Sequence, residues 1–252
     1  MQDCNPVATP MEHNLKLTST EGIMFEDPTK YKKLVGSLNF LTTTRPDIAF
    51  VVGILSRFMH KPCEGHWNAA KQVFKHLKGT QTYGIKYSKV LYFHLTGYSD
   101  SDFEGDKENG VSTSCYLMSL GSTAISWRSH KQFVPANSTT KAEYVAIAQA
   151  TKEIIWLCKI LEDLQEKPKA STPLLVDNSS AIVLAKNPKF HNRSKHINTK
   201  YHLIRHYVGA KVIHLTHCPT SEQIAYIFTK PHGREKFEKF IMLLGMSDVP
   251  SY

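Results

Sequence analysis

Residues 97–106 read GYSDSDFEGD and follow directly on an apolar run, so four carboxylates gather at one point of the chain. The alternation of apolar and polar side chains before Asp100 predicts a strand that ends near this residue. For Asp102, Glu104 and Asp106, a solvated turn is the plainest interpretation. Because the chain has a formal net charge of +9, the acidic residue at the strand end calls for a further explanation.

The chain after this stretch is expected to form a mixed sheet covered by helices. Runs with a period of two, joined by short turns, predict an antiparallel meander. A long helix, a short apolar strand, two helices, another strand and a last helical region follow, and this order is typical of an α/β fold. The expected strands are residues 84–88, 91–100, 112–120, 122–129, 172–177 and 212–218, and the expected helices are residues 140–164, 178–188, 195–208 and 220–230.

The first third of the chain predicts a small helical unit behind an extended lead-in, residues 1–26. Asp27 is placed to cap a first helix, a second is expected to begin at Pro46, and a third spans residues 65–80. At the end of the third helix, cationic side chains and Gly79 predict a stop in which the glycine takes a left-handed turn.

Composition narrows the class of protein. With 252 residues, of which 41% are hydrophobic, the chain is long enough for one large domain or two small ones. The excess of 31 Lys and Arg over 22 Asp and Glu points to a polyanionic partner, nucleic acid before membrane. Five widely spaced cysteines and the lack of a signal peptide favour an intracellular setting, cytoplasmic or nuclear. No apolar run approaches the roughly 20 residues that span a bilayer.

Three acidic residues at the ends of predicted elements suggest a metal centre. Asp100 and Asp177 each close a predicted strand, and Glu143 lies near the start of the long helix. If these elements are neighbours the carboxylates converge, and two unit charges about 4 Å apart repel by roughly 4 kcal/mol at an effective dielectric of 20. Oxygen ligands suit Mg²⁺ or Mn²⁺, which act in pairs in phosphodiester hydrolysis. A helix cap at Asp177 and a helix-dipole position for Glu143 are the structural alternatives.

Dense blocks of recognisable sequence run from residue 27 to residue 246. They are YKKLVGSLNFLTTTRPDIAF, LSRFMHKP, HWNAAKQVFKHLKGT, GYSDSDF, STSCYLMSLGSTAISWRSHKQ, STTKAEY, ATKEIIWL, LLVDNSSAIVLAKNP, KHINTKYHLIR and IFTKP. Together these blocks resemble the C-terminal part of copia-type LTR-retrotransposon Pol polyproteins. The resemblance implies a ribonuclease H-like domain over residues 89–232, with a mixed five-stranded sheet flanked by helices. It also implies a helical remnant of reverse transcriptase over residues 27–88 and a C-terminal helix and tail over residues 233–252. The polymerase catalytic segment is not among the blocks, so we expect no polymerase activity.

Residue by residue, the resemblance implies that Asp100, Glu143 and Asp177 are the metal ligands. With two Mg²⁺ (or Mn²⁺) ions, they would cut the RNA strand of an RNA–DNA hybrid. In QIAYIFTK, Tyr226 stands where the family has a fourth acidic ligand. Because the unperturbed pKa of tyrosine is about 10, a neutral phenol does not supply the same anionic oxygen, and we expect weakened cleavage.

The remaining expectations concern the substrate and one departure from the family. Arg128, Lys131 and Asn178 are expected to bind the substrate, with the cationic pair holding phosphates. His217, after the last strand, is expected to handle protons or assist product release. Cys115 stands at a family glycine and would crowd a turn if that turn required positive φ.

Three other functions are alternatives to cleavage of an RNA–DNA hybrid. Histidines crowd one region and suggest zinc, but cysteine pairs and an HExxH motif are missing. A Ser-His-Asp hydrolase would need a GxSxG elbow, which is also missing. A catalytically inactive nucleic-acid-binding module or a relic fragment is the main alternative to the enzyme, and metal-dependent cleavage separates the two. The histidines concerned are His191, His196, His202, His206, His214 and His217.

Overall fold

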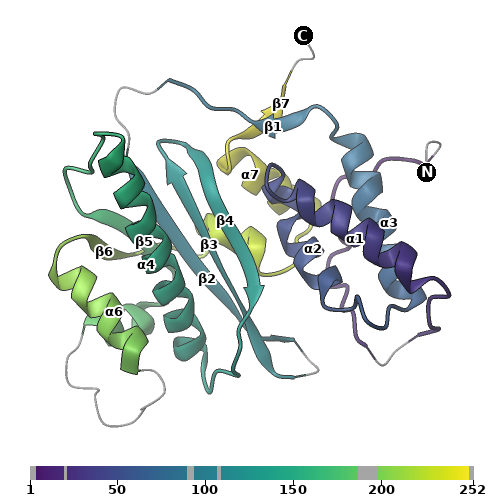
Figure 1. Ribbon diagram of the computed structural model, residues 1–252, viewed down its shortest axis with the longest axis horizontal. Coiled ribbons are helices and arrows are strands. Elements are labelled where there is room, and N and C mark those ends of the chain that lie inside the picture. The colour runs from purple at the N-terminus through teal and green to yellow at the C-terminus, as the bar shows by residue number, and fades with distance from the viewer. Residues whose placement is uncertain (1–3, 20–21, 90–93, 107–108, 187–197, 250–252) are drawn as a thin grey trace. The chain divides into compact units, whose positions relative to one another are not determined.

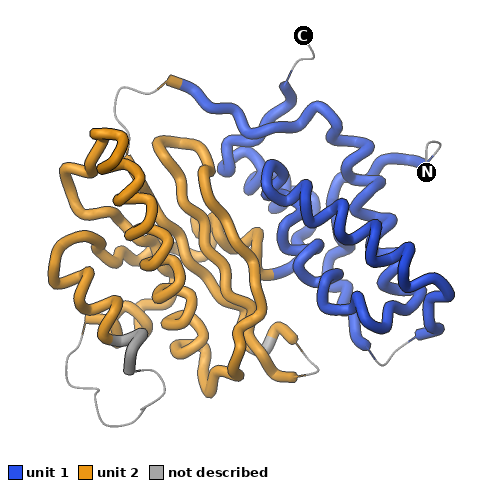
Figure 2. The backbone as a smooth tube through the Cα atoms, in the orientation of Figure 1, with its two compact units in different colours: residues 1–88, 230–252 blue, residues 89–229 orange. Residues whose placement is uncertain are grey.

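The chain folds into two compact units, which Figure 2 distinguishes by colour. The computed structural model describes residues 4–19, 22–89, 94–106, 109–186 and 198–249. Unit 1 comprises residues 1–88 and 230–252, and unit 2 comprises residues 89–229. Unit 1 is therefore built from both ends of the sequence. The sequence sets residues 233–252 apart as a tail, whereas the structure groups them with the N-terminal helices.

Unit 1 consists of helices and one small sheet (Figure 1). Its elements are α1 (Pro28–Leu41), η1 (Pro46–Ile48), α2 (Ala49–Ser56), α3 (Glu64–Gly79), β1 (Tyr83–Ile85), α7 (Arg234–Leu243) and β7 (Met246–Asp248). Asp27 caps α1 as predicted, because its carboxylate accepts the backbone N–H of Lys30 at 2.9 Å. Apolar faces of α1, α2 and α3 share one core, in which Tyr31, Leu38 and Val73 are fully buried.

A buried charge cluster joins the start of η1 to the end of α3. Asp47 Oδ2 lies 2.6 Å from Arg45 Nη2 and 3.0 Å from His76 Nε2. Arg45 also donates to the hydroxyl and the carbonyl of Thr80, at 2.6 and 2.9 Å. Burial by itself raises the pKa of Asp47, but the hydrogen bonds from Arg45 and His76 outweigh it and hold the pKa below its ordinary value. The cluster therefore keeps an ionised carboxylate inside unit 1.

Gly79 ends α3 for a different reason than the one predicted. It is the last residue of the helix, and the positive φ expected there is not found. A Cβ on Gly79 would instead lie 2.9 Å from the Cβ of Pro6. Close by, Lys78 Nζ donates to the carbonyl of Cys4 at 2.9 Å. The glycine thus makes room for the N-terminal segment to pack on α3, and the turn that follows at residues 80–82 does not require a left-handed Gly79.

Unit 2 is built on one mixed sheet of five strands. Its elements are β2 (Leu95–Asp106), β3 (Val111–Leu120), β4 (Thr123–Lys131), α4 (Thr139–Asp163), β5 (Thr172–Val176), α5 (Ser179–Lys186), α6 (Asn198–Gly209), β6 (Ile213–His217) and η3 (Ile224–Phe228). The strand order is β4-β3-β2-β5-β6. β2, β3 and β4 form an antiparallel meander, whereas β5 runs parallel to both β2 and β6. The predicted α/β fold with a mixed five-stranded sheet is confirmed.

Two strand predictions need correction. The sequence predicts residues 84–88 as the first strand of the meander, but β1 pairs with β7 in a separate two-stranded sheet of unit 1. The sequence also predicts a strand end near Asp100, whereas β2 continues to Asp106. Asp102 pairs with Thr113, and the pairing resumes at Asp106 after a bulge. The acidic residues after Asp100 therefore belong to a strand and not to a turn.

Helix α4 packs on the sheet and defines the main core of unit 2 (Figure 1). Gly97 allows this close approach, because a Cβ there would lie 2.9 Å from Ile154 Cδ1 and 3.1 Å from Leu174 Cδ1. The short helix η3 contacts β2 and β3. In the described ranges of the chain, no helix is both long and apolar enough to cross a membrane.

Candidate metal centre

Parallel pairing of β2 with β5 places Asp100 and Asp177 at neighbouring positions. The register pairs Ser99 with Val176, so the next residue on each side is an aspartate. Glu143 comes from the second turn of α4. One carboxylate oxygen of each acidic residue lies within 4.8 Å of the others. Within the part of the chain that the structure describes, no other group of three or more His, Cys, Asp or Glu side chains is placed to hold a metal ion.

Glu143 is a buried carboxylate, 4% exposed, whose two oxygens differ in environment. Oε1 accepts the backbone N–H of Ser101 at 2.9 Å and the Ser101 hydroxyl at 2.8 Å. Oε2 is buried and has no hydrogen-bond partner among the described residues. Burial, followed by the charge of Asp100, raises the pKa of Glu143 well above its ordinary value, although the Ser101 hydrogen bonds act in the opposite direction.

These three carboxylates can hold a divalent metal ion. A buried polar atom without a partner costs about 1–3 kcal/mol, and more when it is charged. Close carboxylates add mutual repulsion, which a cation between them would reverse. All the available donors are oxygens, as hard divalent cations prefer. An unpartnered oxygen on Glu143, a residue grouped with two further carboxylates, therefore fits a cation site.

The short helix η3 is tied to the strands that carry the aspartates. Gln223 is fully buried, and its Nε2 donates to the carbonyls of Ser99 at 3.0 Å and Leu175 at 3.3 Å. At the end of η3, the Thr229 hydroxyl donates to Asp100 Oδ2 at 3.1 Å. Sequence reasoning missed Gln223 and Thr229. In the sequence, the only indication of these two residues is that they are polar and flank the apolar run of η3. Many surface helices share this feature.

Tyr226 and Cys115, two departures from the family pattern, both lie near this site. Tyr226 is half-buried within η3 and adds no carboxylate to the group of three. Cys115 lies inside β3 opposite Asp100 and not in a turn, so the crowding of a turn that its side chain would cause does not arise. Its Sγ lies 3.1 Å from the carbonyl of Ala225 and 3.3 Å from that of Asp100. Burial, followed by the charge of Asp100, raises the pKa of the Cys115 thiol, so the thiol stays protonated.

The expected substrate-binding residues occupy different environments. Arg128 is exposed on β4, whereas Lys131 forms an ion pair with Asp106. Asn178 caps α5, because its Oδ1 accepts the backbone N–H of Ala181 at 3.0 Å. Of these three residues, Arg128 alone combines a cationic side chain with an exposed position, and the substrate role of each of the three stays a prediction.

His217 is exposed at the end of β6 and pairs in register with Val176, the residue before Asp177. Its expected role in proton handling stays a prediction. Of the histidines that suggested zinc, His191 and His196 lie outside the described residues. His214 Nδ1 lies 3.0 Å from the Ser171 hydroxyl. The described histidines do not enter the one group that can hold a metal ion.

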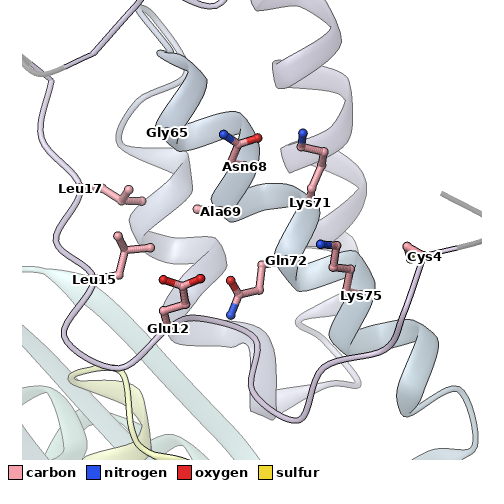
Figure 3. Close-up of a pocket in the computed structure, with 10 residues that line it drawn as sticks. All are labelled: Cys4, Glu12, Leu15, Leu17, Gly65, Asn68, Ala69, Lys71, Gln72 and Lys75. Atoms are coloured by element: carbon pink, nitrogen blue, oxygen red, sulfur yellow. The ribbon is translucent and has the colours of Figure 1, made fainter.

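A separate surface cavity of about 560 Å³ lies in unit 1, between the N-terminal segment and α3 (Figure 3). Lys71, Gln72 and Lys75 line it from the helix, and Glu12, Leu15 and Leu17 line it from the N-terminal segment. It contains both signs of charge and an apolar part. The cavity shares no residue with the three carboxylates of unit 2.

The mixed sheet, with its acidic group where β2 and β5 run side by side, defines unit 2 as a ribonuclease H-like domain. No protein-family model matches the sequence. The chain is 41% identical over 250 residues to the Retrovirus-related Pol polyprotein from transposon RE2 of Arabidopsis thaliana, and this match covers 99% of the chain and 17% of that polyprotein. It is 38% identical over 260 residues to the corresponding polyprotein from transposon TNT 1-94 of Nicotiana tabacum, with 98% of the chain and 19% of that polyprotein covered.

The chain therefore belongs to the family of copia-type retrotransposon Pol polyproteins, as the sequence blocks imply. It spans less than a fifth of the length of these two relatives. Among solved structures, that of LC11-RNase H1 in complex with an RNA/DNA hybrid is similar at 13% identity with a TM-score of 0.40, over 57% of this chain and 97% of that chain.

Proposed function

We propose that unit 2 hydrolyses the RNA strand of RNA–DNA hybrids in a reaction that depends on divalent metal ions. The observation that carries this proposal is the buried, unpartnered Oε2 of Glu143 beside two further carboxylates. A domain of this family has no structural need for three acidic side chains within 4.8 Å of one another, because their repulsion opposes folding. A role in binding cations explains why they are together.

Asp100, Glu143 and Asp177 would hold two ions, Mg²⁺ or Mn²⁺. Bound there, such ions stabilise the charge that develops at the scissile phosphate and lower the pKa of the attacking water. Ser101 holds Glu143 through two hydrogen bonds to one oxygen and leaves the other oxygen for the cation. The carboxylates of the chain thus set where the phosphate is held.

A nucleic-acid substrate agrees with the net charge of the chain. The formal charge is +9, although the site itself is acidic, so phosphates are attracted by the rest of the surface. We propose that Arg128, which is exposed on β4, contacts a phosphate of the substrate. Recognition of a hybrid would depend on its shape and on the 2′-hydroxyls of its RNA strand, and base sequence would have little effect.

Tyr226 is expected to lower the rate. A family member with an acidic residue at this position has one more anionic oxygen for the second ion, whereas the phenol of tyrosine is neutral near pH 7. We therefore expect slow cleavage that improves when Tyr226 is replaced by aspartate. The same observation favours the second candidate function, a nucleic-acid-binding module without catalytic activity.

The test is cleavage of a labelled RNA–DNA hybrid with Mg²⁺ and with Mn²⁺. The full chain is compared with Asp177→Asn, with Tyr226→Asp and with Asp163→Asn, which changes an exposed carboxylate at the end of α4 and serves as the matched control. We expect cleavage by the chain and by Asp163→Asn, loss in Asp177→Asn and a gain in Tyr226→Asp. If all four proteins bind the hybrid and none cleaves it, the proposed enzyme activity is refuted and the second candidate function, a nucleic-acid-binding module without catalytic activity, is supported.

A further inference from the structure

Each of the three carboxylates has one oxygen bound to a hydroxyl group of the chain itself. The Ser101 hydroxyl donates to Glu143 Oε1 at 2.8 Å, and the Thr229 hydroxyl donates to Asp100 Oδ2 at 3.1 Å. On Asp177, Oδ2 accepts from the Thr220 hydroxyl at 3.0 Å. The three donors come from separate parts of unit 2, namely β2, the end of η3 and the loop after β6. The same type of donor thus recurs at every acidic residue of the centre.

Hydroxyl donors suit this site because they are uncharged. A lysine or arginine at the same place would orient a carboxylate but would also cancel its negative charge and compete with a cation. A hydroxyl restricts the rotation of the carboxylate and leaves its full charge available to the metal. Donors of this kind typically change metal affinity 10- to 100-fold when they are removed.

Thr229 is buried, and its single hydroxyl proton has two acceptors within reach. Its hydroxyl lies 3.1 Å from Asp100 Oδ2 and 2.9 Å from the carbonyl of Tyr226. That carbonyl also receives the backbone N–H of Thr229 at 3.2 Å. Removing the hydroxyl therefore leaves the Tyr226 carbonyl with a donor, whereas Asp100 Oδ2 loses the one that Thr229 supplies.

We propose that Ser101, Thr220 and Thr229 are the positioning residues of the metal centre, each fixing one carboxylate for cation binding. This inference rests on the proposed metal site and not on the proposed cleavage. It names no contact between these hydroxyls and the substrate. Their effect is therefore expected on metal affinity in the absence of any nucleic acid.

The test is a Mn²⁺ titration of the full chain, in which the electron paramagnetic resonance signal of free Mn²⁺ reports binding. Thr229→Val has the shape of threonine without the hydroxyl, and we expect it to weaken Mn²⁺ binding about 10-fold. Thr229→Ser restores a hydroxyl and should return the affinity to within about twofold of the original chain. Thr151→Val is the matched control, since Thr151 is fully buried in α4 and its hydroxyl has no partner among the described residues.

Ser101→Ala provides a second, independent measurement, because it keeps the backbone N–H bond to Glu143 and removes only the hydroxyl bond. A weaker Mn²⁺ affinity in this variant is expected as well. Equal Mn²⁺ affinity in Thr229→Val and the original chain, or a failure of Thr229→Ser to restore binding, would overturn the proposal. So would an original chain that binds no Mn²⁺. Weakened binding in the variants of a chain that does not cut the hybrid would support the positioning role and reject only the proposed cleavage.

Discussion

Replacing Glu143 by glutamine should stabilise the metal-free protein at pH 8 and leave its stability nearly unchanged at pH 5. Because burial and the charge of Asp100 raise the pKa of Glu143 in the folded state, the protonated form is favoured by folding. The contribution of Glu143 to stability is therefore complete below its unfolded pKa, about 4.3, and is lost as the pH rises through the folded pKa. Glutamine has no charge to lose, so the Glu143→Gln variant should not show this decline.

The size of the effect follows from the spacing of the site. Two unit charges 4.8 Å apart, at an effective dielectric of 20, repel by about 3.5 kcal/mol, and Glu143 faces two such charges. Because Glu143 can take up a proton, only part of this repulsion is felt at pH 8, and we expect a gain of about 2–4 kcal/mol for glutamine. For a unit of this size, the melting temperature should rise by roughly 5–15 °C.

Differential scanning calorimetry in EDTA at pH 5 and pH 8 measures this effect, with Asp163→Asn as the control. Saturating Mn²⁺ should reverse the order at pH 8, since the original chain gains a bound cation and the variant lacks one ligand. The reasoning would be refuted if Glu143→Gln lowered the melting temperature at pH 8, or if its effect were equal at the two pH values. Either result would mean that Glu143 is not held close to the other two carboxylates.

Three further substitutions test the packing around the site and in unit 1. Asp47→Asn removes the carboxylate charge of the buried cluster in unit 1 and should lower the unfolding free energy, measured by urea titration, by about 3–5 kcal/mol. A loss below about 1 kcal/mol would contradict the ion pairing of Asp47. Gly97→Ala forces a Cβ to within 2.9 Å of Ile154 and should cost about 1–3 kcal/mol, which the smaller Ile154→Val change should partly relieve. Gln223→Leu removes the donor to the carbonyls of Ser99 and Leu175 and should destabilise unit 2 by about 1–3 kcal/mol. Amide hydrogen exchange in β5 should also become faster. Unchanged exchange in β5 would argue against a role of Gln223 in joining the two strands.

Local patterns in the sequence are sufficient to predict most of the helices and strands. Asp27 predicts the start of α1 because a cap bond forms within one turn of the chain. The apolar run before Asp177 predicts β5 because a short apolar run of this kind is typical of a strand in a sheet core, and the residues of β5 are alternately buried and partly buried. The convergence of Asp100 with Glu143 and Asp177 depends only on parallel pairing of two strands and on a helix packed across them.

The remaining features depend on contacts between residues that are distant in the chain. Pairing of β1 with β7 brings together segments from opposite ends of the sequence, and no local pattern signals it. The polar residues after Asp100 have the composition of a turn, yet β3 provides strand partners for them. Thr229 and Ser101 could not be singled out, because a hydroxyl residue becomes a donor to a carboxylate only after the fold has placed both.

The discontinuity of unit 1 affects how the protein can be made. About 160 residues separate β1 from β7 along the chain, so a ribosome adding 5–20 residues per second delivers the second strand on the order of 10–30 s after the first. The whole of unit 2 emerges within that interval and can fold first. A nascent chain would therefore expose the edge of β1 during this time, and premature termination within unit 2 would leave that edge without its partner strand.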